Sequence, residues 1–148
     1  MKRRVVGAAL SMVLWFHAIA LCGGPSQVTP PDAPTTKVTV DAAHPWVDSG
    51  LTVSKGERLS FAAEGTIQWG GEPGQVAGPQ GHDAKVGKLG KGGLIGRVGM
   101  TGKPFAIGST RAPLVMPKSG ELFLGINDFV FGDNAGAFTV TIARSGRP

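Results

Sequence analysis

Two segments near the C-terminus show apolar and polar residues in strict alternation. The alternating apolar positions are Leu122, Leu124, Ile126, Phe138, Val140 and Ile142. A period of two places these side chains on one face of an extended chain, which is typical of half-buried β-strands. Residues 121–127 and 137–143 are therefore predicted to be strands. The short connection between them predicts that the two strands lie next to each other.

Short apolar runs bounded by glycine and proline recur along the rest of the chain. They cover residues 37–40, 46–53, 58–63, 66–69, 94–98, 104–108 and 112–116. A kink is expected at Gly50, inside the second run. Extended helical periodicity is scarce, so the pattern favours an all-β fold. We expect an antiparallel β-sandwich of about eight or nine short strands.

The N-terminus has the features of an export signal. Three basic residues at 2–4 precede the apolar run 5–21, whose length and flanks indicate a secretory signal rather than a membrane span. Two alternative processing sites at the end of this signal fit the sequence. Ala18-Ile19-Ala20 forms a cleavage site that would release a soluble protein, whereas Ile19 to Cys22 resembles a lipobox in which Cys22 receives a lipid. Leu21 departs from the small residue usual before such a cysteine.

Two observations favour lipidation. Cys22 is the only cysteine of the chain and stands where the apolar run ends, and a lone thiol is a liability in an oxidising compartment. Residues 22–36 are rich in proline and polar residues, as in an extended tether. We therefore expect a signal at 1–21, a linker at 22–36 and one domain at 37–146. The expected location is a membrane-anchored lipoprotein of the periplasm or cell surface, with secretion as the alternative.

Net charge and motif content argue against two classes of function. The chain of 148 residues has 15 basic and 10 acidic residues, but three basic residues leave with the signal, so 12 against 10 remain, a net charge of +2. Nucleic-acid binding thereby loses its main support. The sequence lacks a nucleophile-elbow motif and a zinc-ligand spacing. An enzyme is not expected.

The connection between the last two predicted strands is rich in oxygen ligands. Asn127, Asp128, Asp133 and Asn134 lie within eight positions of one another. Two carboxylates and two amides exceed what a tight turn requires. Hard oxygen ligands of this kind suit Ca²⁺. A polar loop made of good turn formers is the alternative interpretation.

Several stretches together resemble the PA-I-type galactophilic bacterial lectins. The clearest likeness is in the C-terminal run GIND...GDNAGAFTVTI. Three further similar stretches occur in the same order as in that family: 46–53, GPQG at 78–81 and GGLIGRVG at 92–99. The resemblance covers about residues 40–143. It implies a galactose-binding-domain-like sandwich of the jelly-roll type that binds carbohydrate through a calcium ion.

The resemblance also implies a ligand set. Asp128, Asp133 and Asn134 would be the side-chain ligands of Ca²⁺, and Trp69 falls near an aromatic position whose carbonyl coordinates the ion in that family. Phe131 is a further candidate carbonyl ligand. Asp128 and Asp133 would also contact the sugar. The loop is about two residues shorter than usual in the family, and Asp133 replaces an amide.

The sugar contacts depart from the family pattern. A His and a Gln contact galactose there, and in the corresponding stretch here only His82 offers a comparable side chain. The leading hypothesis is thus a calcium-dependent lectin-like domain that binds a galactose-like glycan, is anchored to a membrane by its lipid and can form a homo-oligomer. The alternative is a structural envelope lipoprotein with a closed or absent ion site and no sugar.

Overall fold

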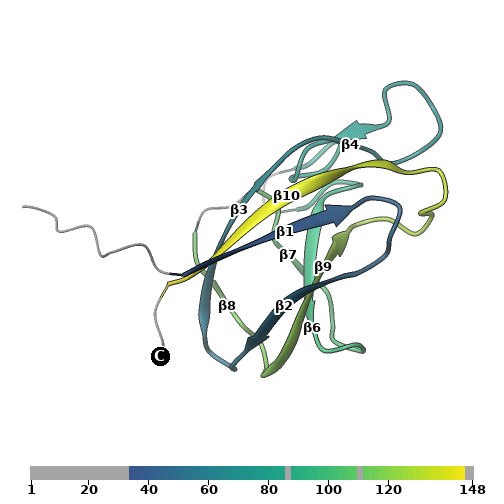
Figure 1. Cartoon of the computed structure of the whole chain (residues 1–148). Helices are drawn as coiled ribbons and strands as arrows, with labels where there is room; N and C mark the ends of the chain where they lie inside the picture. Colours follow the sequence, from purple (N-terminus) through teal and green to yellow (C-terminus); the bar gives the residue numbers. More distant parts are fainter. Residues whose placement is uncertain (1–33, 86–87, 110–111, 146–148) are drawn as a thin grey trace, which may run out of the picture.

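A computed structural model describes residues 34–85, 88–109 and 112–145, which form two antiparallel β-sheets (Figure 1). The predicted signal, most of the linker and Cys22 lie outside the described residues. The strands of the described part are β1 (Thr35–Asp41), β2 (Val47–Val53), β3 (Arg58–Glu64), β4 (Ile67–Gln68), β5 (Val76–Ala77), β6 (Leu94–Val98), β7 (Phe105–Ala106), β8 (Leu114–Val115), β9 (Gly120–Ile126) and β10 (Ala135–Arg144). No helix in these residues is long and apolar enough to cross a membrane.

The larger sheet is built around β10. It has the order β5-β4-β10-β3-β8. The strand β1 lies off this path and also pairs with β10. The smaller sheet has the order β2-β9-β6-β7. The predicted all-β antiparallel sandwich is confirmed. The two-residue strand β5 was not predicted, because its segment is glycine-rich and carries no alternation.

The pairing of the last two strands differs from the prediction. β9 and β10 were expected to be neighbours, but β9 pairs with β2 and β6, whereas β10 pairs with β1, β3 and β4. Loop 127–134 therefore passes from one sheet to the other. Alternation identifies the buried face of a strand but not its partner, which explains the error.

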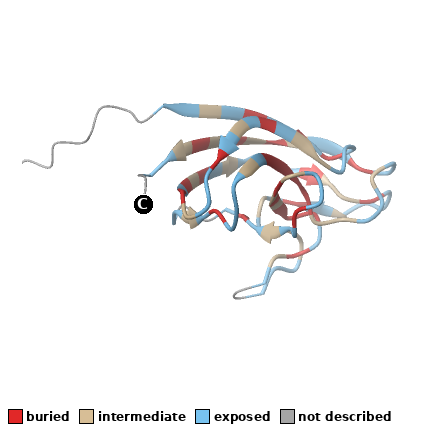
Figure 2. Cartoon of the chain, turned by 90° about the horizontal axis from the view of Figure 1, so that it is seen from below, coloured by how far each residue is buried: buried red, intermediate tan, exposed pale blue. Residues whose placement is uncertain are grey.

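The core lies between the two sheets and contains the residues that alternate in the sequence. Phe61 and Phe138 of the larger sheet and Leu122 and Leu124 of the smaller one are completely buried in one cluster. Figure 2 shows the buried residues concentrated on the strands and the loops largely exposed. Burying each such side chain stabilises the fold by roughly 1.5–3 kcal/mol.

The predicted kink in β2 is confirmed. The register of β2 against β9 shifts between Asp48 and Thr52, and Gly50 has a φ of 71°. That backbone conformation favours glycine. Within the irregular segment, buried Ser49 donates a hydrogen bond from Oγ to the carbonyl oxygen of Leu122 at 2.6 Å. The bulge is therefore tied to the strand beside it.

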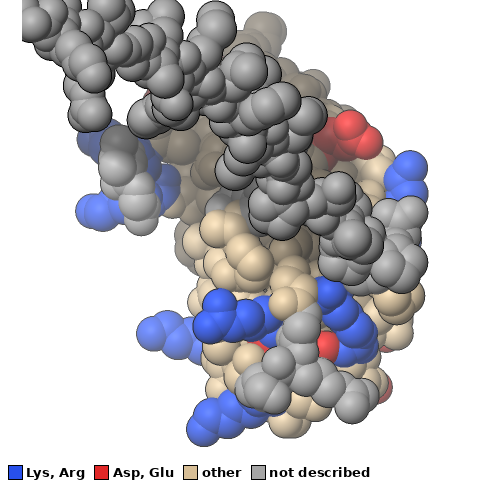
Figure 3. All heavy atoms as spheres, turned by 90° about the vertical axis from the view of Figure 1, so that its left-hand side faces the viewer, with Lys and Arg blue, Asp and Glu red and all other residues tan. Residues whose placement is uncertain are grey.

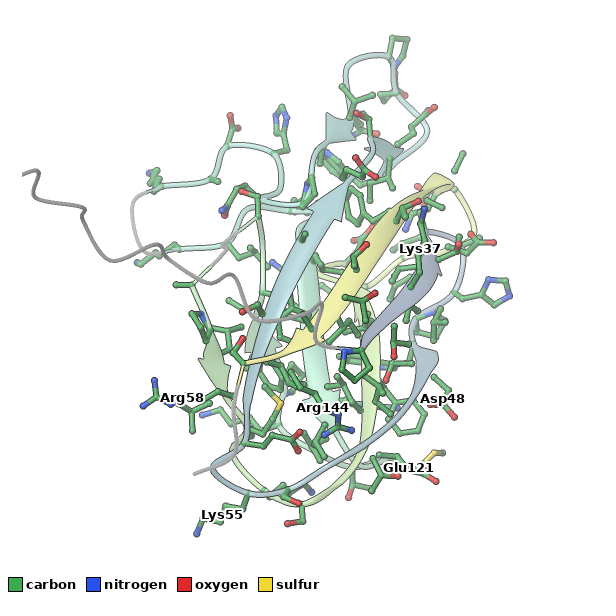
Figure 4. All side chains as sticks on the ribbon, turned by 60° about the vertical axis from the view of Figure 1, so that its left-hand side comes forward. Lys37, Asp48, Lys55, Arg58, Glu121 and Arg144 are labelled. Carbon is green, nitrogen blue, oxygen red and sulfur yellow. The ribbon has the colours of Figure 1, made fainter. Side chains whose placement is uncertain are left out.

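One end of the sandwich is closed by an ion pair, and we call it the turn end (Thr52 to Glu57 with Ser119 and Arg144). Glu57, almost fully buried, accepts a hydrogen bond from the backbone N–H of Ser54 and forms a salt bridge with Arg144. Arg144 also donates to the carbonyl oxygen of Thr52, on the other sheet. Lys55 and Arg58 instead point outward (Figure 4). The turn end thus links the two sheets through paired groups.

Candidate functional site

The opposite end of the sandwich holds the residues of the predicted site, and we call it the loop end (Trp69, residues 82–85 and 88–93, and loop 127–134). Backbone hydrogen bonds fix the start of loop 127–134. Asn127 donates its N–H to Gly93 at 2.7 Å and accepts one from Gly92 at 3.0 Å, and its side-chain amide donates to the Gly90 carbonyl oxygen at 3.1 Å. Asp128 is therefore held where β9 ends.

Asp128 has one carboxylate oxygen in use and one free for a ligand. Its Oδ1 accepts a hydrogen bond from the backbone N–H of Phe129 at 2.7 Å. Its Oδ2 is buried and has no hydrogen-bond partner in the described part of the chain. A buried carboxylate oxygen without a donor or cation is costly, so this atom is a candidate ligand for a cation or for a hydrogen-bond donor.

Asn134 shows the same asymmetry. It is 9% exposed, and its Nδ2 donates to the carbonyl oxygen of Ala42 at 3.1 Å. Its Oδ1 is buried and lacks a partner among the described residues. Because the donor side of the amide is anchored to the β1–β2 connection, the acceptor side is held in a fixed orientation.

Trp69 lies at the same end of the fold as these two residues. β10 pairs with β4 so that Ala135 is opposite Gln68, and Asn134 and Trp69 are the residues next to this pair in the sequence. A Cβ atom at Gly92 would lie 3.0 Å from Cβ of Trp69, and Gly92 is bonded to Asn127. The pairing thus brings the predicted residues Trp69, Asp128 and Asn134 to one end of the fold.

The other two predicted calcium ligands, Asp133 and Phe131, do not have a buried, unpartnered side-chain oxygen among the described residues. Asp133 is exposed on the loop, one position before Asn134. Phe131 packs its ring against the core and accepts a hydrogen bond at its carbonyl oxygen from the Asn134 N–H at 3.3 Å. Neither placement assigns these residues to an ion.

His82 lies beside Trp69, together with a residue that the sequence did not single out. The rings of His82 and Trp69 are 5.5 Å apart, and the Lys91 ammonium lies 4.5 Å from the Trp69 ring centroid. The backbones of His82 and Lys91 are bridged, with a hydrogen bond of 2.7 Å. No sequence pattern indicates that Lys91 would contact Trp69.

The candidate donor atoms of the predicted ligands at the loop end are oxygens. In the described residues, no group of three or more His, Cys, Asp or Glu side chains could hold a metal ion. The available donors are instead carboxylate, amide and carbonyl oxygens, which calcium accepts. On the face shown in Figure 3, which is the left-hand side of Figure 1, lysine and arginine side chains predominate over acidic ones.

Comparisons with known proteins identify the family of the chain. No protein-family model matches the sequence. Lectin A of Photorhabdus laumondii is 30% identical over 107 residues, a match that covers 67% of this chain and 82% of that protein. A solved structure described as the EclA N-terminal domain, a PllA-like lectin, has a TM-score of 0.63 and 26% identity, covering 74% of this chain and 95% of that one.

The fold is that of a lectin-type β-sandwich. By its similarity to Lectin A, the chain belongs to this family of bacterial lectins.

Proposed function

We propose that this protein is an exported, calcium-dependent carbohydrate-binding protein whose loop end holds the ion and the sugar. Membership of a bacterial lectin family supports carbohydrate binding. The same membership favours a non-enzymatic role. The single observation that carries the calcium part is the pair of buried, unpartnered oxygens, Asp128 Oδ2 and Asn134 Oδ1.

Asp128 and Asn134 would hold the ion through these oxygens. Calcium takes 6–8 oxygen ligands, so backbone carbonyls such as those of Trp69 and Phe131, and the carboxylate of Asp133, are the candidates for further positions. The ion would supply positions on which two sugar hydroxyls replace water. Phe129 and Ala42 keep the two side chains oriented through the hydrogen bonds already described.

A galactose-like sugar is the expected ligand class, with His82 beside it. His82 and Lys91 frame the Trp69 ring, so a sugar at the loop end would meet polar groups on that side. Single-site affinities of this kind are expected to be on the order of millimolar to micromolar. Anchoring through Cys22, or formation of a homo-oligomer, would raise the effective affinity through multivalency.

The alternative is a structural envelope lipoprotein that binds no sugar. The exposure of Asp133 favours it, because a ligand set without this carboxylate carries a single negative charge. A glycan array probed with and without calcium separates the two. We expect binding in calcium that is lost in chelator and in Asp128→Asn, and retained in Glu121→Gln, at the opposite end of the same strand. An array without calcium-dependent signal would support the structural role.

The membrane anchor is tested independently. Mass spectrometry of the exported protein should show an N-terminal Cys22 carrying lipid, and Cys22→Ser should remain unprocessed or become soluble. A mature chain that begins at Leu21 with a free thiol would overturn the anchor and leave a secreted protein.

A further inference from the structure

Four exposed basic residues lie at the turn end, and we call their surface the basic face: Lys55, Arg58, Lys103 and Lys118. None of the four forms a salt bridge with another described residue. Of the described acidic residues, Glu57 and Glu121 lie at this end, and Glu57 is neutralised by Arg144. The basic face therefore keeps an excess of positive charge that the described part of the chain does not compensate.

Three segments bring these basic residues together. The backbone N–H of Lys55 donates to Ser119 Oγ at 2.9 Å, which holds Lys55 next to the segment that contains Lys118. The Lys118 side chain extends over Gly99, where an added Cβ would lie 3.4 Å from Nζ. Gly99 begins the β6–β7 connection, which carries Lys103. The basic face is thus built by turns that the fold holds side by side.

Lys103 and Lys118 border a cavity of about 350 Å³. Its apolar walls include Val98, Phe105 and Pro117, and no described residue of its lining is acidic. The volume lies within the range of roughly 300–1,000 Å³ of small-molecule sites. Two ammonium groups beside apolar walls suit an anionic group on an apolar body, since ammonium groups form strong hydrogen bonds with phosphate. A lipid headgroup with its attached chains has this order of groups.

Two exposed apolar side chains accompany the basic face. Met100, on the β6–β7 connection, is 70% exposed, and Val115 of β8 is 56% exposed. Val115 is paired with Arg58 across the β3–β8 ladder. Binding to a membrane surface combines buried apolar area with the attraction of basic side chains to anionic lipids. The turn end offers both contributions on one surface.

The chain enters the domain at this same end. Thr35, the first residue of β1, pairs with Ala143, next to Arg144 (Figure 1). Cys22 precedes Thr35 by 13 positions in the sequence, which can span at most about 47 Å. A lipid at Cys22, as proposed above, would therefore keep the turn end within reach of the bilayer.

We infer that the basic face docks on the surface of an anionic lipid bilayer, with a headgroup phosphate between Lys103 and Lys118. This inference rests on the membrane location in the proposed function. Each basic residue near an anionic bilayer strengthens binding about fivefold. A second copy of the chain is a poor occupant, because two basic faces repel each other. In the docked orientation, the loop end points away from the bilayer and is open to glycans.

Vesicle sedimentation tests the docking without the lipid anchor. The mature chain carries Cys22→Ser, and chelator removes calcium, so neither the anchor nor the proposed ion site contributes to the signal. We expect the chain to sediment with vesicles of equal parts phosphatidylglycerol and phosphatidylcholine, and not with vesicles of phosphatidylcholine alone. The partition coefficient should fall as the salt concentration rises, because salt screens charges at a surface.

Two double variants with the same net charge locate the surface. Lys103→Gln combined with Lys118→Gln should lower the partition coefficient at least about tenfold. Lys85→Gln combined with Lys88→Gln removes two exposed lysines from the loop end and should change it by no more than about twofold. Equal losses in the two variants would overturn the docking surface, since the chain would then respond to net charge alone.

A fluorescent label reports which end meets the bilayer. Cys22→Ser leaves the chain without cysteine, so Met100→Cys and Phe129→Cys can each carry one environment-sensitive dye. Met100 is 70% and Phe129 is 92% exposed, and they lie at opposite ends of the sandwich. We expect the emission of the dye to rise on anionic vesicles at position 100 and to stay constant at position 129.

The outcomes separate this inference from the proposed function. A chain that fails to sediment with anionic vesicles, or whose dye responds at position 129 instead of position 100, would overturn the docking surface and leave calcium and sugar binding untouched. Binding to a DNA duplex without binding to anionic vesicles would overturn it in favour of a soluble polyanion. A glycan array without signal would remove the sugar, whereas sedimentation in chelator would still support the basic face.

Discussion

The two ends of the sandwich differ in whether their buried polar groups have hydrogen-bond partners. At the turn end, both carboxylate oxygens of Glu57 have partners, Ser54 and Arg144, and Arg144 also reaches Thr52. At the loop end, Trp69 Nε1, Asp128 Oδ2 and Asn134 Oδ1 are buried without partners in the described part of the chain. β10 runs between them, from Ala135 beside the loop to Arg144 at the turn.

The difference separates an end whose buried polar groups are paired within the chain from an end where, in the described residues, three buried polar atoms are not. Buried polar groups in native proteins are almost always satisfied, and the turn end follows this rule with groups of its own chain. Three of the four unpartnered buried side-chain atoms found among the described residues gather at the loop end. Stability and sugar binding are thus expected to reside at different ends, which the following substitutions examine.

The largest effect on stability is expected from Arg144→Met. The Glu57 side chain is 6% exposed, so removing its cation leaves a buried charge with one remaining hydrogen bond. We expect the free energy of unfolding to fall by roughly 2–3 kcal/mol, less than for a fully buried pair because Arg144 is itself 41% exposed. Urea denaturation measures the change, and calcium should still stabilise the variant.

Arg58→Met is the matched control for that substitution. Arg58 is exposed and points outward from β3 (Figure 4), so its loss should change stability by no more than about 0.5 kcal/mol. Equal losses in Arg144→Met and Arg58→Met would show that the ion pair does not hold the turn end together.

A smaller loss is expected from Asn134→Ala, measured in chelator. The variant loses the hydrogen bond to Ala42 and leaves that carbonyl without this donor, which should cost about 1–2 kcal/mol. Asp133→Ala, at the exposed neighbouring position, should be close to neutral under the same conditions. If the exposed neighbour proved as important as Asn134, the description of Asn134 as an anchored ligand would be wrong.

The smallest effect on stability is expected from Phe129→Ser. Because this ring is almost fully exposed, the free energy of unfolding should change by no more than about 0.5 kcal/mol. Phe131→Ser should cost more, since the Phe131 ring packs against the core. Thermal melting of the two variants tests this, and a large loss in Phe129→Ser would mean that the loop tip is covered in solution.

The sequence predicted the strands better than their partners. Alternation located β9 and β10 correctly, but it could not show that they belong to different sheets, because pairing depends on the whole arrangement of the fold. It also gave no indication that Glu57 is buried. A Lys-Gly-Glu turn is normally solvent-exposed, and the partner of Glu57 is 87 positions away in the sequence.

The candidate site was predicted in part. The oxygen-rich composition of loop 127–134 drew attention to Asp128 and Asn134, and the structure places both at the same end of the fold as Trp69. The contact of Lys91 with Trp69 had no sequence signal. It depends on the close approach of segments that are far apart in the chain, which a one-dimensional pattern does not record.

The central claim is that the loop end is completed by calcium, and thermal unfolding with calcium and with chelator tests it most directly. For the wild type and Glu121→Gln, calcium at a hundredfold excess over Kd should add about 2.7 kcal/mol to the free energy of unfolding. Asp128→Asn keeps a side-chain oxygen for the Phe129 N–H but loses the charge, and its gain should disappear. Identical melting of the wild type in calcium and in chelator would contradict the account.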